Sequence, residues 1–137
     1  MVYGGLRFFD RAEIKNAMAY MRLAENPSDD SAFLRVVNVP ARGIGAKSIE
    51  NLVDFATTNG ISLFESMQYI RGAAAAKFAA FKEIIDTLRV AKDEMPLPAF
   101  VDFTVEKSGL KNMYEMDPNG SERIENLQEL TSAAQGF

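Results

Sequence analysis

Residues 37–50 read VNVPARGIGAKSIE and separate two segments whose apolar residues recur at helical spacing. Pro40 cannot continue the helix before it, and Gly43 and Gly45 bracket a single apolar residue, Ile44. Glycine lets the backbone turn tightly and carries no Cβ where a ligand approaches. We therefore expect a helix-hairpin-helix-like Gly-Ile-Gly turn, with Ile44 directed into a core.

The residues after this turn are predicted to begin a helix, and the start of a helix can bind an anion. The first N–H groups of a helix lack intrahelical partners and lie at the positive end of the helix dipole. Arg42 and Lys47 flank them in the sequence. Such an arrangement suits a phosphate oxygen, and nucleic-acid backbone is the first candidate partner. A turn whose glycines serve close packing alone stays an open alternative.

The composition limits what the chain can do. Its 137 residues are 47% apolar, enough for the core of one domain, and carry a net charge of −4. This acidic balance argues against nucleic acid wrapped over the whole surface, so any DNA contact is expected to be local. The sequence has no cysteine and no histidine, which excludes disulfides, the usual zinc centres and histidine-based catalysis.

Targeting signals are also absent from the sequence pattern. No apolar run approaches the roughly 18 residues of a membrane-spanning helix, and the first residues do not read as a secretory signal. We therefore predict a cytoplasmic protein without a membrane partner.

Helical spacing of apolar residues continues on both sides of the turn. Asp10 with Glu13, and Ser62 with Glu65, are typical of helix N-terminal capping pairs, and the Asn-Gly at 59–60 is typical of a C-terminal cap. No strand pair is evident, so the predicted fold class is all-α, a compact domain of about seven helices. These helices are expected over residues 10–26, 29–39, 46–58, 62–71 and 73–94, from about 100 onward with a break near 108–109, and from 121 onward.

Residues 1–9 are aromatic and glycine-bearing, with no capping residue before them. We expect a strand and turn here, at the edge of a larger domain. Tyr3, Phe8 and Phe9 are expected to expose apolar surface that another part of the protein covers.

No set of residues suited to catalysis is evident. The Asp29-Asp30 pair stands beside a predicted helix start, where carboxylates interact favourably with the helix dipole, and this is favoured over metal ligation. Glu122, Arg123 and Glu125 are interpreted as a solvated helix face with local ion pairs. No GxxxxGK[ST] nucleotide loop occurs. We predict no catalytic residue and no metal site, and an enzyme acting on its own is the least favoured function.

Two long blocks, residues 3–23 and 33–45, resemble the UvrD/Rep/PcrA family of superfamily 1 DNA helicases. They read YGGLRFFDRAEIKNAMAYMRL and FLRVVNVPARGIG. The closing segments SGL (108–110), MY (113–114) and RIENLQEL (123–130) are similar to the family's segments at corresponding distances. The resemblance implies that residues 1–26 are the edge of the second motor domain and that residues 27–137 are the accessory 2B helical subdomain.

The resemblance further implies a parent enzyme that unwinds DNA in the 3′-to-5′ direction in DNA repair and uses ATP and magnesium. The family's ATP-binding loop and metal site lie in motor domains outside these residues, so no cofactor is expected in this fragment. In the family the Gly-Ile-Gly turn contacts duplex DNA through its backbone. Ala41 stands where family members often have threonine, so one hydroxyl contact is absent. The predicted DNA-binding residues are Arg35, Arg42, Gly43, Ile44, Gly45, Lys47 and Ser48.

The implied partners are the backbone of double-stranded DNA, the motor domains of the same helicase, and repair proteins. The alternative function is a regulatory or protein-interaction module that gates the helicase by rotation. Acidic faces expected at residues 25–30 and 115–117 favour that alternative. The two roles are compatible with each other.

Overall fold

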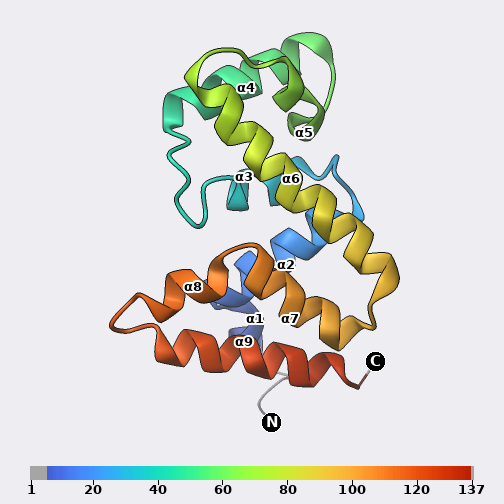
Figure 1. Cartoon of the computed structure of the whole chain (residues 1–137), viewed down its shortest axis with the longest axis vertical. Coiled ribbons are helices and arrows are strands. Elements are labelled where there is room, and N and C mark those ends of the chain that lie inside the picture. The colour runs from blue at the N-terminus through green and yellow to red at the C-terminus, as the bar shows by residue number, and fades with distance from the viewer. Residues whose placement is uncertain (1–5, 137) are drawn as a thin grey trace.

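The computed structural model describes residues 6–136, and all regular structure within that range is helical (Figure 1). The prediction of an all-α fold is confirmed. The helices in chain order are α1 (Leu6–Asp10), α2 (Ala12–Glu25), α3 (Asp30–Val36), α4 (Ala46–Asn59), α5 (Leu63–Ser66), a 3₁₀ turn (Met67–Tyr69), α6 (Ala73–Glu94), α7 (Leu97–Lys107), α8 (Leu110–Glu115) and α9 (Ser121–Ala134). Residues 6–136 hold more α-helices than the predicted seven, because the short α1 and α8 are separate from α2 and α7.

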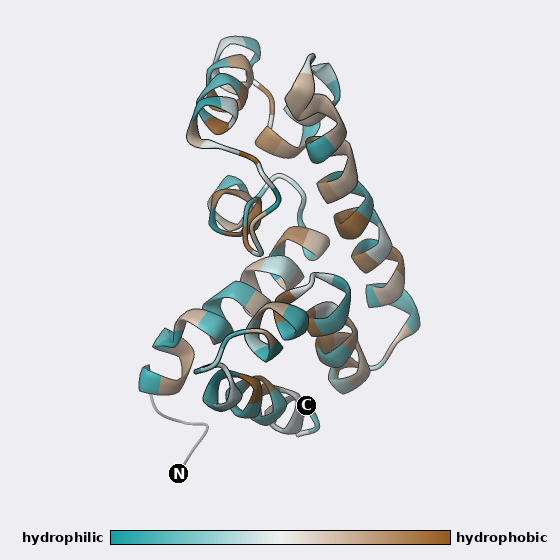
Figure 2. Cartoon of the chain, turned by 60° about the vertical axis from the view of Figure 1, so that its left-hand side comes forward, coloured by the Kyte–Doolittle hydropathy of each residue, from teal (hydrophilic) through white to brown (hydrophobic). Residues whose placement is uncertain are grey.

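Helix α2 lies at the centre of the fold. It packs against α3, α6, α7 and α9, while α4 packs on α5 at the other end of the molecule. The long α6 connects the two ends, from the α4–α5 end to the joint with α7 (Figure 1). Along α6 and its neighbours, hydrophobic and hydrophilic residues recur around the turns (Figure 2), as expected for helices that bury one face.

Aromatic side chains form the centre of the core. Tyr20, Phe33, Phe78 and Phe81 are all fully buried. The rings of Phe33 and Phe81 meet edge to face, with 5.5 Å between their centroids. Helices α2, α3 and α6 are therefore joined at one aromatic cluster, next to which the loop between α3 and α4 begins.

Most predicted helix ends are confirmed. Gly60 closes α4 in the left-handed conformation, with φ of 63°. The Ser62 side chain accepts a hydrogen bond from the amide of Glu65, 3.0 Å away, and so caps α5. Helix α6 ends at Glu94, and the break near residues 108–109 separates α7 from α8.

The predictions for the first residues are wrong in two respects. Asp10 does not cap a helix with Glu13: it is the last residue of α1, and Arg11 precedes α2 without a side-chain capping bond. Residues 6–9, expected as strand and turn, belong to α1. Phe8 is buried, whereas Phe9 is 40% exposed as predicted. Residues 1–5, with Tyr3, lie outside the described part of the chain.

Within residues 6–136, no helix combines the length and the apolar character needed to cross a membrane.

Candidate nucleic-acid interface

The loop between α3 and α4, residues 37–45, is organised by the side chain of Asn38. Its Oδ1 accepts hydrogen bonds from the amides of Arg42, at 2.7 Å, and Ile44, at 3.2 Å. Ile44 is 1% exposed, so the prediction that it points into the core is confirmed. The Gly-Ile-Gly turn is thus anchored from inside by one amide side chain and one buried aliphatic side chain.

Gly43 and Gly45 differ in what they contribute to this loop. Gly43 has φ of +77°, a left-handed conformation that glycine adopts without steric cost. Its carbonyl accepts a hydrogen bond from Nζ of Lys77, 2.9 Å away on α6. Gly45 has φ of −80° and ψ of 171°, which any residue adopts, and a Cβ built on it would meet nothing within 4 Å. Only Gly43 is needed for the turn, and Gly45 leaves space open.

That open space lies at the N-terminus of α4. The amide of Ile49 makes the first backbone bond of the helix, to the carbonyl of Gly45 at 3.1 Å. The amides of Ala46, Lys47 and Ser48 precede it and have no carbonyl one turn back. Gly45 carries no side chain that could accept from them, and α4 has no side-chain cap. Three amide groups and the positive end of a 14-residue helix therefore face outward.

Lys47 and Ser48 stand on this same first turn. The Lys47 side chain is 80% exposed, and its Nζ lies 3.9 Å from a carboxylate oxygen of Glu50, a weak surface pair. Ser48 is half-buried. The Lys47 ammonium could reach a phosphate bound at the helix N-terminus. Among the described residues, Glu50 is the only carboxylate that forms an ion pair with Lys47.

Arg42 is directed away from this outward face. Its Nη1 and Nη2 both donate to groups inside the fold, and its guanidinium carbon lies 5.1 Å from the ring centre of Phe81. The acceptors of Nη1 are the carbonyls of Val36 (3.1 Å), Val37 (3.3 Å) and Pro40 (3.1 Å). Those of Nη2 are the hydroxyl of Tyr20 (2.6 Å) and the carbonyl of Ser108 (3.0 Å). The structure therefore places this predicted site residue on the inner side of the loop.

Tyr20 links the arginine to α2. Its hydroxyl donates to the carbonyl of Val39, and the carbonyl of Val36 lies 3.3 Å away. Burial raises the pKa of Tyr20 to about 12, an effect that the nearby Arg42 charge partly opposes. Tyr20 is therefore a neutral phenol at physiological pH and supplies both a donor and an acceptor under the loop.

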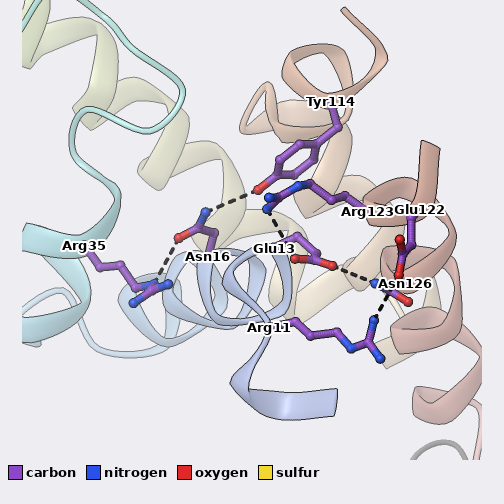
Figure 3. Close-up of polar contacts among 8 residues, drawn as sticks. All are labelled: Arg11, Glu13, Asn16, Arg35, Tyr114, Glu122, Arg123 and Asn126. Atoms are coloured by element: carbon purple, nitrogen blue, oxygen red, sulfur yellow. Dashed lines mark hydrogen bonds and ion pairs between the residues drawn. The ribbon is translucent and has the colours of Figure 1, made fainter. Parts of the chain in front are cut away.

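Arg35 belongs to a different surface. Its Nε donates to Oδ1 of Asn16, 3.0 Å away, and the amide nitrogen of Asn16 lies 3.3 Å from the Tyr114 hydroxyl (Figure 3). A groove of about 710 Å³ between α1, α2 and α3 contains Arg35 together with Lys15 and Arg22. The structure thus groups Arg35 with other cations at this groove, away from the outward turn of α4.

Figure 3 also shows a polar cluster that fastens α9 to α2. The buried carboxylate of Glu13 accepts from the amide nitrogen of Asn126 at 2.7 Å and lies 3.6 Å from Nη1 of Arg123. Arg11 pairs with Glu122 at 3.7 Å. Glu122, Arg123 and Glu125 are exposed, so the predicted solvated face of this helix is confirmed. The prediction that its ion pairs are local is wrong, because Glu122 pairs with Arg11 and Arg123 with Glu13 of α2. Side chains 113 positions apart in sequence meet here, which no local pattern indicates.

The two carboxylates at the start of α3 have structural partners. Asp29 accepts from the amide of Ala32 at 3.0 Å and caps α3, so the prediction of a favourable interaction at the helix start is confirmed. Asp30 accepts from the amide of Leu63, 3.0 Å away, and joins α3 to α5. Within residues 6–136, no three carboxylates gather in a way that could hold a metal ion.

The sequence of the chain matches a known class of protein over its whole length. The family model of the UvrD-like helicase C-terminal domain matches residues 1–137, and the chain belongs to this family. The predicted resemblance is confirmed.

Particular relatives agree with this assignment. The chain is 42% identical over 144 residues to DNA helicase II of Haemophilus influenzae and 40% identical to that of Escherichia coli, with 99% of the chain covered in each case. It is 34% identical over 143 residues to the ATP-dependent DNA helicase PcrA of Bacillus subtilis, again over 99% of its length. The chain spans about a fifth of the length of these relatives, 20%, 20% and 19% respectively.

Proposed function

We propose that residues 27–137 of this chain form the accessory 2B subdomain of an ATP-dependent 3′-to-5′ DNA helicase that acts in DNA repair in the cytoplasm, and that the subdomain contacts the backbone of duplex DNA. The observation that carries the DNA contact is the open N-terminus of α4. Gly45 leaves free space in front of it, and three amides face that space beside Lys47. Membership of the helicase family supplies the ligand class.

In this proposal the amides of residues 46–48, with the Lys47 ammonium and the Ser48 hydroxyl, hold phosphate oxygens of one strand. The backbone of Gly43, Ile44 and Gly45 forms the surface that the duplex approaches. Such contacts position the protein without reading sequence. With two to four phosphates engaged, the slope of log K against log salt is about −2 to −4, and the affinity is about 10⁻⁴–10⁻⁶ M at physiological salt.

The motor domains of the parent helicase, with ATP and magnesium, would supply the pulling force. The division into a motor-domain edge at residues 1–26 and the 2B subdomain at 27–137 stays a prediction about that parent. As a folding unit, however, α2 cannot be separated from the rest, because Ile14, Tyr20 and Leu23 are fully buried in the shared core. Experiments on DNA contact should therefore use the whole 137-residue chain.

The test is a titration of fluorescent duplex and single-stranded DNA at about 20 and 150 mM salt. Gly45→Val fills the open space with a side chain that suits the extended backbone of this position. We expect it to lower duplex affinity about tenfold or more, since losing a hydrogen bond to a charged group costs about 1.5–3 kcal/mol.

Two lysine variants distinguish the loss of a phosphate contact from a change in net charge. Lys47→Ala should weaken duplex binding and make the salt slope shallower by about 0.9, because it removes one phosphate neutralisation. Lys92→Ala changes the net charge equally at the far end of α6, where Lys92 pairs with Glu25 at 3.4 Å. Equal affinities of Gly45→Val, Lys92→Ala and the parent chain for duplex would refute the proposed DNA contact.

The groove between α1, α2 and α3 favours the regulatory module as a second candidate function. It combines the cations Lys15, Arg22 and Arg35 with the exposed apolar side chains Phe9 and Leu34. Its basic, partly apolar lining fits an acidic protein segment, from the motor domains or from a repair partner. In the parent helicase, Lys15→Glu with Leu34→Asp should then alter ATP hydrolysis while this chain keeps its duplex affinity. Unchanged ATP hydrolysis would count against a regulatory groove.

A further inference from the structure

We propose that Arg42 is a positioning residue: it fixes the Gly-Ile-Gly loop by capping the C-termini of two helices, and it does not bind the phosphate itself. This inference rests on the proposed DNA contact of the loop and assigns the arginine its part in it. Arg42 is the cation nearest the two glycines in sequence, and sequence reasoning therefore placed it among the DNA ligands.

The first step of the argument is donor count. A guanidinium has four N–H groups on its two Nη atoms, and bidentate binding of phosphate uses at least one of them. In Arg42 the two Nη atoms serve five acceptors inside the fold, all between 2.6 and 3.3 Å away. A phosphate could engage an Nη atom of Arg42 only after some of these bonds were broken.

The second step concerns which groups accept these bonds. Val36 is the last residue of α3, and Val37 is its C-cap. Ser108 is the C-cap of α7, and it lies 66 positions from Arg42 in sequence. Carbonyls at helix C-termini lack intrahelical donors and lie at the negative end of the helix dipole, where a cation is favoured. Arg42 supplies donors and positive charge to both ends at once.

The third step is that the loop itself rests on the α7–α8 joint. A Cβ built on Gly109, between these helices, would lie 3.2 Å from Cγ of Pro40. Arg42 also bonds the Pro40 carbonyl and the Tyr20 hydroxyl, so it connects the loop to α2 and to this joint. The direction of the outward amides therefore depends on an arginine that faces inward.

Arg42→Lys distinguishes a positioning role of Arg42 from direct binding of phosphate. Lysine keeps the charge, but its single nitrogen cannot reach two helix ends in a fixed geometry. If Arg42 positions the loop, lysine does not rescue duplex binding: affinity falls about tenfold, with the salt slope unchanged. If Arg42 binds a phosphate, lysine largely restores binding, and Arg42→Gln makes the slope shallower by about 0.9, as Lys47→Ala does.

A second readout needs no DNA. Amide ¹H–¹⁵N resonances of Gly43, Ile44 and Gly45 should shift in free Arg42→Lys and stay in place in free Lys47→Ala. Unmoved amides together with rescue by lysine would overturn the positioning role. If the parent chain fails to bind duplex, the proposed DNA contact fails, while these resonances still show whether Arg42 fixes the loop.

Tyr20→Phe is the second variant, for the case that Arg42→Lys does not fold. It retains the buried ring and removes the hydroxyl that Nη2 of Arg42 contacts at 2.6 Å. We expect smaller amide shifts in the same residues and a smaller loss of duplex affinity at unchanged salt slope. Unmoved loop amides with full affinity in Tyr20→Phe would contradict the link from α2 through Arg42 to the loop.

Discussion

The two sides of the Gly-Ile-Gly loop differ in how completely their polar groups are satisfied. On the inner side, Asn38, Arg42 and Ile44 contact the fold through hydrogen bonds or burial. On the outer side, Gly45 and the first turn of α4 present amides with no side-chain cap. Side chains at positions 42 and 44 face the core, whereas positions 43 and 45 carry none. The polar groups on the inner side of the loop are thus hydrogen-bonded within the fold, whereas the amides on its outer side have no side-chain acceptor.

This difference shows why a cation next to a proposed binding site need not be directed at the ligand. Arg42 and Lys47 flank the same helix start in sequence, yet Arg42 is half-buried under the loop and the Lys47 side chain is 80% exposed. If the comparison holds, inner-side changes cost stability, and outer-side changes cost DNA affinity with little loss of stability.

Ile44→Ala should have the largest effect on stability. Ile44 is 1% exposed, and truncation of a buried isoleucine removes apolar contacts and leaves a cavity. We expect a loss of about 2–5 kcal/mol in the free energy of unfolding, measured by urea denaturation. Val90→Ala, at a position 59% exposed on α6, is the matched surface control and should change it by less than about 0.5 kcal/mol. Similar losses in both variants would contradict the buried anchor.

The second-largest loss of stability is expected at alkaline pH, through Tyr20 on the inner side of the loop. The pKa of Tyr20 is about 12 in the fold, against about 10 in an unfolded chain, so above pH 10 the native state holds a proton that the unfolded state has lost. The contribution of Tyr20 to the free energy of unfolding is therefore fully present below pH 10. It is lost as the pH rises towards 12, by roughly 1–3 kcal/mol in total.

The measurement is the free energy of unfolding between pH 9 and 11.5, for the parent chain and Tyr20→Phe. Every other ionisable group is present in both proteins, so the difference in slope isolates Tyr20. The parent should lose stability more steeply than the variant. Parallel curves would mean that Tyr20 ionises as easily in the fold as in the unfolded chain.

Asn38→Ala should cost about 1–2 kcal/mol, because it leaves the amides of Arg42 and Ile44 without their acceptor in a partly exposed loop. Asn38→Asp keeps an acceptor oxygen at the same place and is the matched control. Chemical denaturation should rank the parent and the aspartate variant above alanine. Equal stability of all three would show that water replaces the side chain at no cost.

Much of the fold could be predicted from the sequence, because its signals are local. Helix α4 and its closing Gly60 follow from apolar spacing and from the need for a residue that adopts positive φ. Ser62 caps α5 as its spacing to Glu65 indicates. The Asp10–Glu13 pair failed because Glu13 has a buried partner, Asn126, in a helix distant in sequence.

The burial of Ile44 and the open helix start after Gly45 could be predicted from the sequence, whereas the inward direction of Arg42 could not. Glycine spacing and a helix start pointed to Gly45 and Lys47 from neighbouring residues alone. The role of Arg42 depends on Tyr20 and Ser108, 22 and 66 positions away, and a single sequence does not show such contacts. Asn38 was detectable in principle, since asparagine often accepts from nearby backbone amides in turns.

The smallest stability effect is expected for Gly45→Ala, and the comparison of this variant with Gly43→Ala is the sharpest test of the two sides. Gly43→Ala forces a Cβ into φ of +77°, which costs about 1–2 kcal/mol, and brings it 3.1 Å from Nζ of Lys77. That lysine is a flexible end and can move, so backbone strain decides the result.

Gly45→Ala involves two opposing terms of similar size. Alanine is a poorer N-cap than glycine by about 0.5–1 kcal/mol, while loss of glycine's freedom in the unfolded chain returns about 0.4–1 kcal/mol. Because a Cβ here meets nothing within 4 Å, no clash is added, and the net change should lie within about 0.5 kcal/mol of zero. Thermal unfolding should therefore separate Gly43→Ala from the parent but leave Gly45→Ala beside it, while duplex titration should show weaker binding by Gly45→Ala. A Gly45→Ala variant as unstable as Gly43→Ala would mean that the outer side is also needed for the fold, and the division between the two sides would fail.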